Sequence, residues 1–293
     1  MPAGAVRPMS VSVQTSKLTL ALGLAGALLG APVTARDVPK RVVSMNLCTD
    51  QLAMLIGGQG QIVSVSQLAA DPRSSAMVEQ AKGYLTNHGR AEEIYLMQPD
   101  LVLAGTYTAR ATVRMLERLG INVVTFEITN SLDAIPEQMI QMGHVLGQEA
   151  KAAGLVAQFE ATLAEYRADV ANRPKAALYH ANGYTSGDRS LAGEILTVAG
   201  FENIAASAGY AGGGVMPLEV LAMAQPEAVI QSAPYGGGSR AEEIMDHPVV
   251  AALRENGEAG GLTDHDWMCG TPFVLQAIAD MTDLRTRIQE AAE

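Results

Sequence analysis

The residue types that most often carry catalysis or bind metal are sparse in this chain. Cys48 and Cys269 are the only cysteines, too few for a four-thiolate zinc site. No G-x-S-x-G or H-E-x-x-H motif occurs in the sequence. Asp264-His265-Asp266 is a dense polar group, which we interpret as a loop rather than a metal site. The histidines are scattered: His88, His144, His180, His247 and His265. The sequence therefore predicts no enzyme, no catalytic residue, no metal site and no cofactor.

Polar and aromatic side chains gather in loops that follow predicted strands. Asn46, Tyr107, Tyr184 and Trp267 occupy such loops, and Trp267 is the only tryptophan of a chain with 4% aromatic residues. In open α/β sheets, ligands bind beyond the carboxyl ends of strands. Amphipathic rings there suit a large, partly apolar ligand with polar edges. These four residues are therefore predicted to bind a ligand; the alternative is that each ring only caps its own hydrophobic core.

The elements that must position these loops alternate between strand and helix. Short runs rich in Val and Ile predict strands at 41–45, 61–66, 101–105, 122–127, 176–181, 228–232 and 261–263. Helical segments separate them, at 50–56, 92–98, 109–119, 191–199, 218–224 and 272–290. This alternation favours an α/β fold with mainly parallel sheets covered by helices.

One long stretch interrupts the alternation. Nearly forty residues, 135–172, carry no strand signal and are dominated by good helix formers. A helix of about 35 residues would be about 50 Å long, so we expect it to link two lobes. The predicted organisation is a signal peptide at 1–35, an N-terminal lobe at 36–135, a linking helix at 136–172 and a C-terminal lobe at 173–293.

The composition excludes two broad classes of protein. Of the 293 residues, 48% are hydrophobic and 17% charged, the opposite of the balance in disordered chains. The formal net charge is −11, whereas a sequence-independent nucleic-acid binder needs a basic surface. We therefore expect a folded protein with no nucleic-acid partner.

The N-terminus predicts export. Arg7 and Lys17 precede an uncharged apolar run, Leu18 to Gly30, which is too short to span a bilayer as a helix. Small residues follow, ending in Val33-Thr34-Ala35. This order is typical of a secretory signal peptide cleaved after Ala35. We expect the mature protein to be soluble and periplasmic.

A short pattern occurs once in each predicted lobe. Glu92 stands seven residues before Pro99, and Glu219 stands seven residues before Pro226. In both places an acidic residue and a predicted strand follow the proline. A common helix–turn–strand motif is enough to explain each copy of the pattern by itself, because Glu favours helix N-termini and Pro ends helices. Its recurrence indicates that the two lobes are related half-structures.

Several motifs taken together resemble one family. They are RVVSMNLCTDQLAMLIG, EEIYLMQPDLVLAG, NGYTSG, PLEVLAMAQPEAVI and HDWMCGTPFVLQAIA, and they extend over nearly all of residues 38–290. The chain resembles the periplasmic binding proteins that serve ABC importers of cobalamin, iron–siderophore complexes and haem. The resemblance implies two Rossmann-like lobes joined by one long rigid helix, a ligand cleft between them, and no catalysis.

The resemblance also ranks the ligands. Thr185-Ser186-Gly187 after an aromatic residue, and Asp266 before Trp267, look like the cobalamin-binding member, in which the corresponding rings contact the corrin. MCGTP after Trp267 departs from that member's pattern. Ferric-siderophore members use Arg or Tyr, a role open to Arg110 and Arg189. Haem members use a Tyr or His ligand, a role open to Tyr107, Tyr184 and His180. We rank a corrinoid first, a ferric siderophore or haem second, and a periplasmic enzyme of unknown chemistry last.

The resemblance further implies a partner, an ABC permease dimer with its ATPase subunits, for a binding protein that is itself monomeric. One exposed Glu on each lobe docks onto permease arginines in this family, and the motif maps that role to Glu92 and Glu219. Glu93 is the alternative to Glu92.

Cys48 follows the first predicted strand and Cys269 the last, so both are expected to face the cleft in an oxidising compartment. A disulfide between them is favoured, with two separate buried thiols as the alternative.

Overall fold

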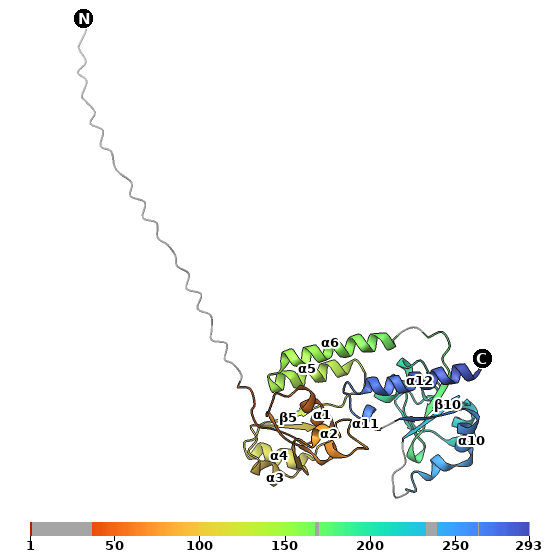
Figure 1. Ribbon diagram of the computed structural model, residues 1–293, viewed down its shortest axis with the longest axis horizontal. Helices are drawn as coiled ribbons and strands as arrows, with labels where there is room; N and C mark the ends of the chain where they lie inside the picture. The colour runs from red at the N-terminus through yellow and green to blue at the C-terminus, as the bar shows by residue number, and fades with distance from the viewer. Residues whose placement is uncertain (2–36, 168–169, 233–238, 263, 293) are drawn as a thin grey trace. The chain divides into compact units, whose positions relative to one another are not determined.

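Two parallel β-sheets, each flanked by helices, form the framework of the protein (Figure 1). The structure is a computed structural model, and it describes residues 1, 37–167, 170–232, 239–262 and 264–292. The predicted signal peptide lies outside the described residues apart from Met1. Val38–Glu293 forms one compact unit, and the description below concerns this unit.

The N-terminal lobe contains a five-stranded sheet in the order β3-β2-β1-β4-β5. Every pairing is parallel, and β1 and β4 are in register through Val42 and Leu101. The central strands are buried on both faces, which explains their continuous apolar runs. The strands are β1 (Val42–Ser44), β2 (Ile62–Ser66), β3 (Leu85–Asn87), β4 (Leu101–Gly105) and β5 (Val123–Phe126). Helical segments between them are α1 (Leu47–Ile56), η1 (Gln67–Ala70), α2 (Val78–Ala81), α3 (Ala91–Leu96) and α4 (Arg110–Arg118).

The C-terminal lobe contains a four-stranded parallel sheet in the order β11-β10-β6-β8. A separate antiparallel pair joins β7 and β9. The strands are β6 (Lys175–Leu178), β7 (Tyr184–Thr185), β8 (Glu202–Asn203), β9 (Gly214–Val215), β10 (Ala228–Ser232) and β11 (Glu258–Leu262). The helical segments are η2 (Ala181–Gly183), α7 (Leu191–Val198), α8 (Ile204–Ser207), α9 (Leu218–Ala224), η3 (Glu243–Asp246), α10 (Pro248–Asn256), α11 (Asp264–Trp267) and α12 (Val274–Ala292).

The predicted single linking helix over 136–172 is instead two helices, α5 (Ala134–Leu146) and α6 (Glu149–Tyr166). Gly147 ends α5 in the left-handed conformation, with φ of 66°. The backbone N–H of Gln148 donates to the carbonyl of Gly143 at 2.7 Å and closes the turn. The chain then reverses, and α6 packs along α5 (Figure 1). Gly143, Gly147 and Gly154 lower the helix propensity of this stretch and make bends possible, but propensity alone could not predict that the chain reverses at Gly147.

One hydrophobic core runs through both lobes. Its buried members include Val42 and Leu103 of the first sheet, Ala176 and Ile230 of the second, and Phe159 of α6. The 18 residues of α6 extend about 27 Å, and the helix leads from the N-terminal lobe to β6. The α/β fold with two lobes agrees with the sequence prediction. Within the described residues, no helix is both long and apolar enough to cross a membrane.

Candidate ligand-binding site

The carboxyl end of the first sheet contributes most of the wall of a cavity of about 250 Å³. Strand order reverses between β1 and β4, so the loops after these two strands diverge and leave a crevice. Asn46 follows β1 and Tyr107 follows β4, and both line the cavity. Asn46 is fixed as the N-cap of α1, where its Oδ1 accepts from the Cys48 N–H at 3.0 Å. Tyr107 is 84% exposed, which leaves its ring open to a ligand.

A second cavity, of about 410 Å³, lies at the carboxyl end of the second sheet. Here the order reverses between β6 and β10. His180 lies just beyond β6, and Ser232 is the last residue of β10. Both line the cavity, and His180 Nδ1 is 3.1 Å from Ser232 Oγ. The switch point of each sheet therefore opens into a cavity, as expected for ligand sites in α/β folds.

The larger cavity has an aromatic wall. His180 and Trp267 stack with ring centroids 5.8 Å apart and planes at 20°. Trp267 also packs against the hydrophobic core, so it combines a packing role with a place in the wall. Its indole Nε1 is buried and meets no hydrogen-bond acceptor among the described residues. Tyr184 adds a third ring from β7. Such a wall suits a flat, partly apolar ligand that also accepts hydrogen bonds.

Both cavities take residues from both lobes, and Met268 belongs to both. Arg73, from the loop before α2, reaches the larger cavity of the C-terminal lobe. Gly270, from the C-terminal lobe, lines the smaller cavity of the N-terminal lobe. Both cavities therefore lie where the lobes meet, and Met268 lines the wall of each.

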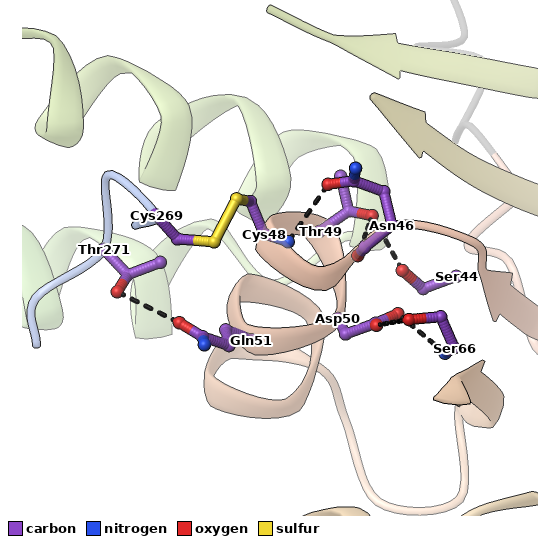
Figure 2. The surroundings of a disulfide bond; sticks show 9 residues. All are labelled: Ser44, Asn46, Cys48, Thr49, Asp50, Gln51, Ser66, Cys269 and Thr271. Carbon is purple, nitrogen blue, oxygen red and sulfur yellow. Dashed lines mark hydrogen bonds between the residues drawn. A yellow bond between two sulfur atoms is a disulfide. The ribbon is translucent and has the colours of Figure 1, made fainter. Parts of the chain in front are cut away.

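A disulfide fixes the segment that carries Trp267 and Met268 (Figure 2). Cys48 in the first turn of α1 is bonded to Cys269, with Cα atoms 5.2 Å apart. This is the bridge that the sequence favoured over two separate thiols. Thr271 donates to Gln51 Oε1 at 3.3 Å beside it. Gly270 lies so close to Thr129 that a Cβ on the glycine would clash with the threonine side chain. These contacts hold the loop before α12 against the N-terminal lobe.

A buried carboxylate lies beneath the same end of α1. Asp50 is fully buried. Its carboxylate accepts two hydrogen bonds from Ser66, one from the backbone N–H at 3.1 Å and one from the side-chain hydroxyl at 2.5 Å (Figure 2). Burial raises the pKa of Asp50 to about 6, and the hydrogen bonds from Ser44 and Ser66 partly offset that rise. The carboxyl therefore titrates near neutral pH although it does not line either cavity.

Charged groups are few in the cavity walls. Arg73 and Glu242 line the larger cavity, and Glu127 lines the smaller. No group of three or more His, Cys, Asp or Glu side chains in the described part of the chain is placed to hold a metal ion. The prediction of a loop at Asp264-His265-Asp266 is wrong, because all three residues lie in helix α11. His265 Nε2 is 3.3 Å from Asp266 Oδ2.

The periplasmic binding protein family model matches residues 42–256, which is most of the chain and includes the first sheet and all of the second sheet except β11. The chain belongs to the periplasmic binding protein family. The match ends before Trp267 and Met268, so the segment fixed by the disulfide lies beyond it.

Curated relatives of this periplasmic binding protein include proteins named for vitamin B12. A "Cobalamin-binding protein" of Halobacterium salinarum is 29% identical over 178 residues, 59% of this chain and 48% of the relative. The chain thus matches about half the length of that relative. A "Vitamin B12-binding protein" of Salmonella choleraesuis is 28% identical over 236 residues, 78% of this chain and 86% of the relative.

Solved structures support the fold. A periplasmic heme-binding protein, RhuT from Roseiflexus sp. RS-1, has a TM-score of 0.68 at 23% identity and covers 87% of this chain and 99% of its own. The vitamin B12-binding protein BtuF of Vibrio cholerae has a TM-score of 0.62 at 18% identity, with 86% and 98% covered. At these identities the likeness establishes the two-lobed architecture alone.

Four of the five residues predicted to bind ligand line the cavities of this periplasmic binding protein. Asn46 and Tyr107 line the smaller cavity, and Tyr184 and Trp267 line the larger. Arg110 does not join them: it is exposed at the start of α4 and lines neither cavity. The cavity walls thus contain rings and an amide, without this guanidinium.

Sequence reasoning did not select Met268 as a site residue, and it named His180 only as a conceivable haem ligand. The predicted strand ran to residue 181 and so included His180, whereas β6 ends at Leu178 and leaves His180 in the loop beyond it. The rule that ligands bind beyond the carboxyl ends of strands selects His180 once that strand end is known. Met268 gave a weaker signal, because methionine is common in ordinary cores and only its place between Trp267 and Cys269 sets it apart.

The two glutamates predicted to dock are both exposed, in the first turns of α3 and α9. Glu93 is engaged locally, since Glu93 Oε2 accepts from the backbone N–H of His88 at 2.8 Å. That contact leaves Glu92 as the more available carboxylate of the adjacent pair.

Proposed function

We propose that this chain is the exported binding component of an ABC importer. It captures a metal chelate, foremost a corrinoid such as cobalamin, and delivers the chelate to a permease. The observation that carries the proposal is the aromatic wall formed by Tyr184, His180 and Trp267 in the cavity at the switch point of the second sheet. The proposal includes removal of the signal peptide, residues 1–35.

The size and chemistry of the cavities support a large ligand. The two cavities have volumes of about 250 and 410 Å³. A ligand that occupied both would fill a space within the usual range of small-molecule sites. A corrin ring has broad apolar faces for the aromatic rings to contact and amide edges for Asn46 to bond. The names of the Halobacterium and Salmonella relatives favour the same ligand class.

Haem is the second candidate because of one specific observation. His180 lines the larger cavity, and its Nδ1 is 3.1 Å from Ser232 Oγ. Imidazole is a common axial ligand of haem iron, and a hydrogen bond at one ring nitrogen orients the ring. If haem binds through His180, the complex should have a Soret absorption that is lost in His180→Ala. A bound corrinoid should show no Soret absorption that depends on His180.

The sole tryptophan makes a direct test of the ligand class possible. Trp267 fluorescence should be quenched saturably, with one-to-one stoichiometry, by cyanocobalamin. Haemin and ferrichrome are titrated in parallel, and calorimetry removes the optical contribution of the coloured ligands. Saturation by haemin or ferrichrome alone would move the assignment to that ligand. Binding of none of the three would refute a metal-chelate site.

Trp267→Ala should weaken ligand binding by roughly 1–3 kcal/mol, the usual scale for losing a buried aromatic anchor. Trp267→Phe keeps a ring against His180 and should retain most of the affinity. Calorimetry on both variants provides the measurement. Tyr95→Ala, which removes an exposed ring outside both cavities, is the control. If Trp267→Ala lowers stability while affinity is unchanged, the indole serves only the core.

We propose that Glu92 and Glu219 dock the two lobes onto the permease dimer. Two carboxylates at equivalent positions of related lobes match a partner with two-fold symmetry, and Arg is the residue best suited to pair with them. Reversing both charges, Glu92→Arg with Glu219→Arg, should abolish stimulation of the importer's ATPase and leave ligand affinity unchanged.

The matched control for this docking prediction is Glu117→Arg with Glu202→Arg. It reverses one exposed glutamate on each lobe away from α3 and α9. The control should stimulate the ATPase normally. Equal loss in both double variants would indicate a general charge effect in place of docking at these two sites.

A further inference from the structure

Helices α3 and α9 end in the same unusual way. Gln98 follows α3 with φ of 50°, and Gln225 follows α9 with φ of 46°. Only one other non-glycine residue in the described chain, Asn182, has positive φ. Each glutamine precedes a proline, Pro99 or Pro226, which disfavours the right-handed helical region for the residue before it. The left-handed residue stops each short helix at the same point of the repeated pattern.

The acid after each proline fastens the turn to the sheet in the same way. The backbone N–H of Arg41 donates to Asp100 Oδ1 at 3.0 Å, and the backbone N–H of Lys175 donates to Glu227 Oε2 at 2.8 Å. In the opposite direction, the backbone N–H of Asp100 donates to the Arg41 carbonyl at 3.0 Å. The backbone N–H of Glu227 likewise donates to the Lys175 carbonyl at 2.8 Å. The two helices are therefore held by equivalent contacts, and their residues correspond one to one.

This correspondence pairs two exposed apolar side chains. Leu96 of α3 is 79% exposed, and Met223 of α9 is 84% exposed. Each stands four residues after its exposed glutamate, so the glutamate and the apolar side chain share one face of the helix. The core does not require them, because Ile94 and Leu221, at the equivalent position two residues earlier, are fully buried and anchor the helices.

A single exposed apolar residue needs no explanation on its own. Here, however, each helix carries an exposed acid followed one turn later by an exposed apolar residue. The same arrangement stands at equivalent positions of the two lobes, so the two surfaces match. We infer that Leu96 and Met223 are apolar anchors that insert beside Glu92 and Glu219 into the two equivalent subunits of the permease dimer. Each subunit then presents a cation next to an apolar pocket. This inference rests on the proposed importer function and adds residues to its docking surface.

The two members of each pair have different physical effects. An exposed carboxylate steers the encounter and sets orientation, and its effect is screened by salt. An apolar side chain removed from water at the interface lengthens the lifetime of the complex, and salt does not screen it. The complex should therefore keep a salt-resistant component of affinity that depends on Leu96 and Met223.

The test measures binding of the ligand-loaded protein to its purified importer complex in nanodiscs. Leu96→Ala and Met223→Ala should each weaken binding roughly tenfold, chiefly by faster dissociation. Met223→Leu keeps an apolar side chain and should retain affinity, whereas Met223→Gln has nearly the same shape and should lose it. The controls, Leu85→Ala and Ile140→Ala, remove apolar residues that are also more than half exposed and should change nothing.

Salt separates this inference from the proposed function. The loss in Leu96→Ala and Met223→Ala should persist at 0.5 M NaCl, where the effect of neutralising Glu92 and Glu219 should largely disappear. If the alanine variants bind normally while the glutamate variants do not, the anchors are refuted and docking stands. If neither set affects binding, docking through these helices is refuted as well. Ligand titration of the isolated variants should be unchanged in every case.

Discussion

Replacing both Cys48 and Cys269 with alanine should lower the free energy of unfolding by about 5 kcal/mol. The bridge joins residues 221 positions apart, and in the chain-entropy account the stabilisation grows with the logarithm of loop length. A loop this long greatly restricts the unfolded chain. Alanine is preferred to serine because Cys269 is only 1% exposed, and a serine hydroxyl there would be buried without a partner.

Urea denaturation of the oxidised wild type, the reduced wild type and the double variant provides the measurement. The reduced wild type and the variant should agree, and reductant should not affect the variant. The m-value should be larger without the bridge, because the unfolded chain then exposes more surface. A difference below about 1 kcal/mol would contradict the chain-entropy account for this bridge.

The fold could be predicted largely from local patterns. Buried parallel strands such as Leu101–Gly105 form continuous apolar runs between turn signals, so their positions are clear in the sequence. Helix α9 begins and ends where the pattern placed it, because Pro217 precedes it and Gln225-Pro226 ends it. The short elements were missed. Strands β3 and β8, of three and two residues, pair through long-range contacts that carry no local periodicity.

The candidate site could be predicted in part, for a related reason. The rule that ligands bind beyond the carboxyl ends of strands placed Asn46, Tyr107, Tyr184 and Trp267 in cavity walls. The same rule cannot tell which loop residues turn inward, and Arg110 turned out to be exposed on a helix. The role of Met268 depends on how the two lobes meet, which no short stretch of sequence encodes.

Asp50→Asn should stabilise the protein at pH 7 but not at pH 4. Asp50 is fully buried, and its pKa rises from 3.8 in the unfolded chain to about 6 in the folded protein. Between these values the folded state holds a proton that the unfolded state has lost, so stability falls as pH rises. Asparagine mimics the protonated carboxyl and can keep a hydrogen bond from the Ser66 N–H. It removes this pH dependence.

The expected size follows from the shift. Asp50 should cost the wild type about 2–3 kcal/mol of unfolding free energy between pH 4 and pH 7, and the asparagine variant should gain that amount relative to it. Urea denaturation at half-unit intervals of pH, on both proteins, measures the difference directly. Other titrating groups are common to the two proteins and cancel in the comparison.

A second variant tests the cause of the shift. Ser66→Ala removes the hydroxyl that bonds the Asp50 carboxylate and keeps the backbone N–H. Because the hydrogen bond from the Ser66 side chain lowers the Asp50 pKa, its loss should raise that pKa further. The pH range over which stability falls should then extend above 6. If the difference between wild type and Asp50→Asn is constant from pH 4 to pH 7, Asp50 has an ordinary pKa and burial does not hold its proton.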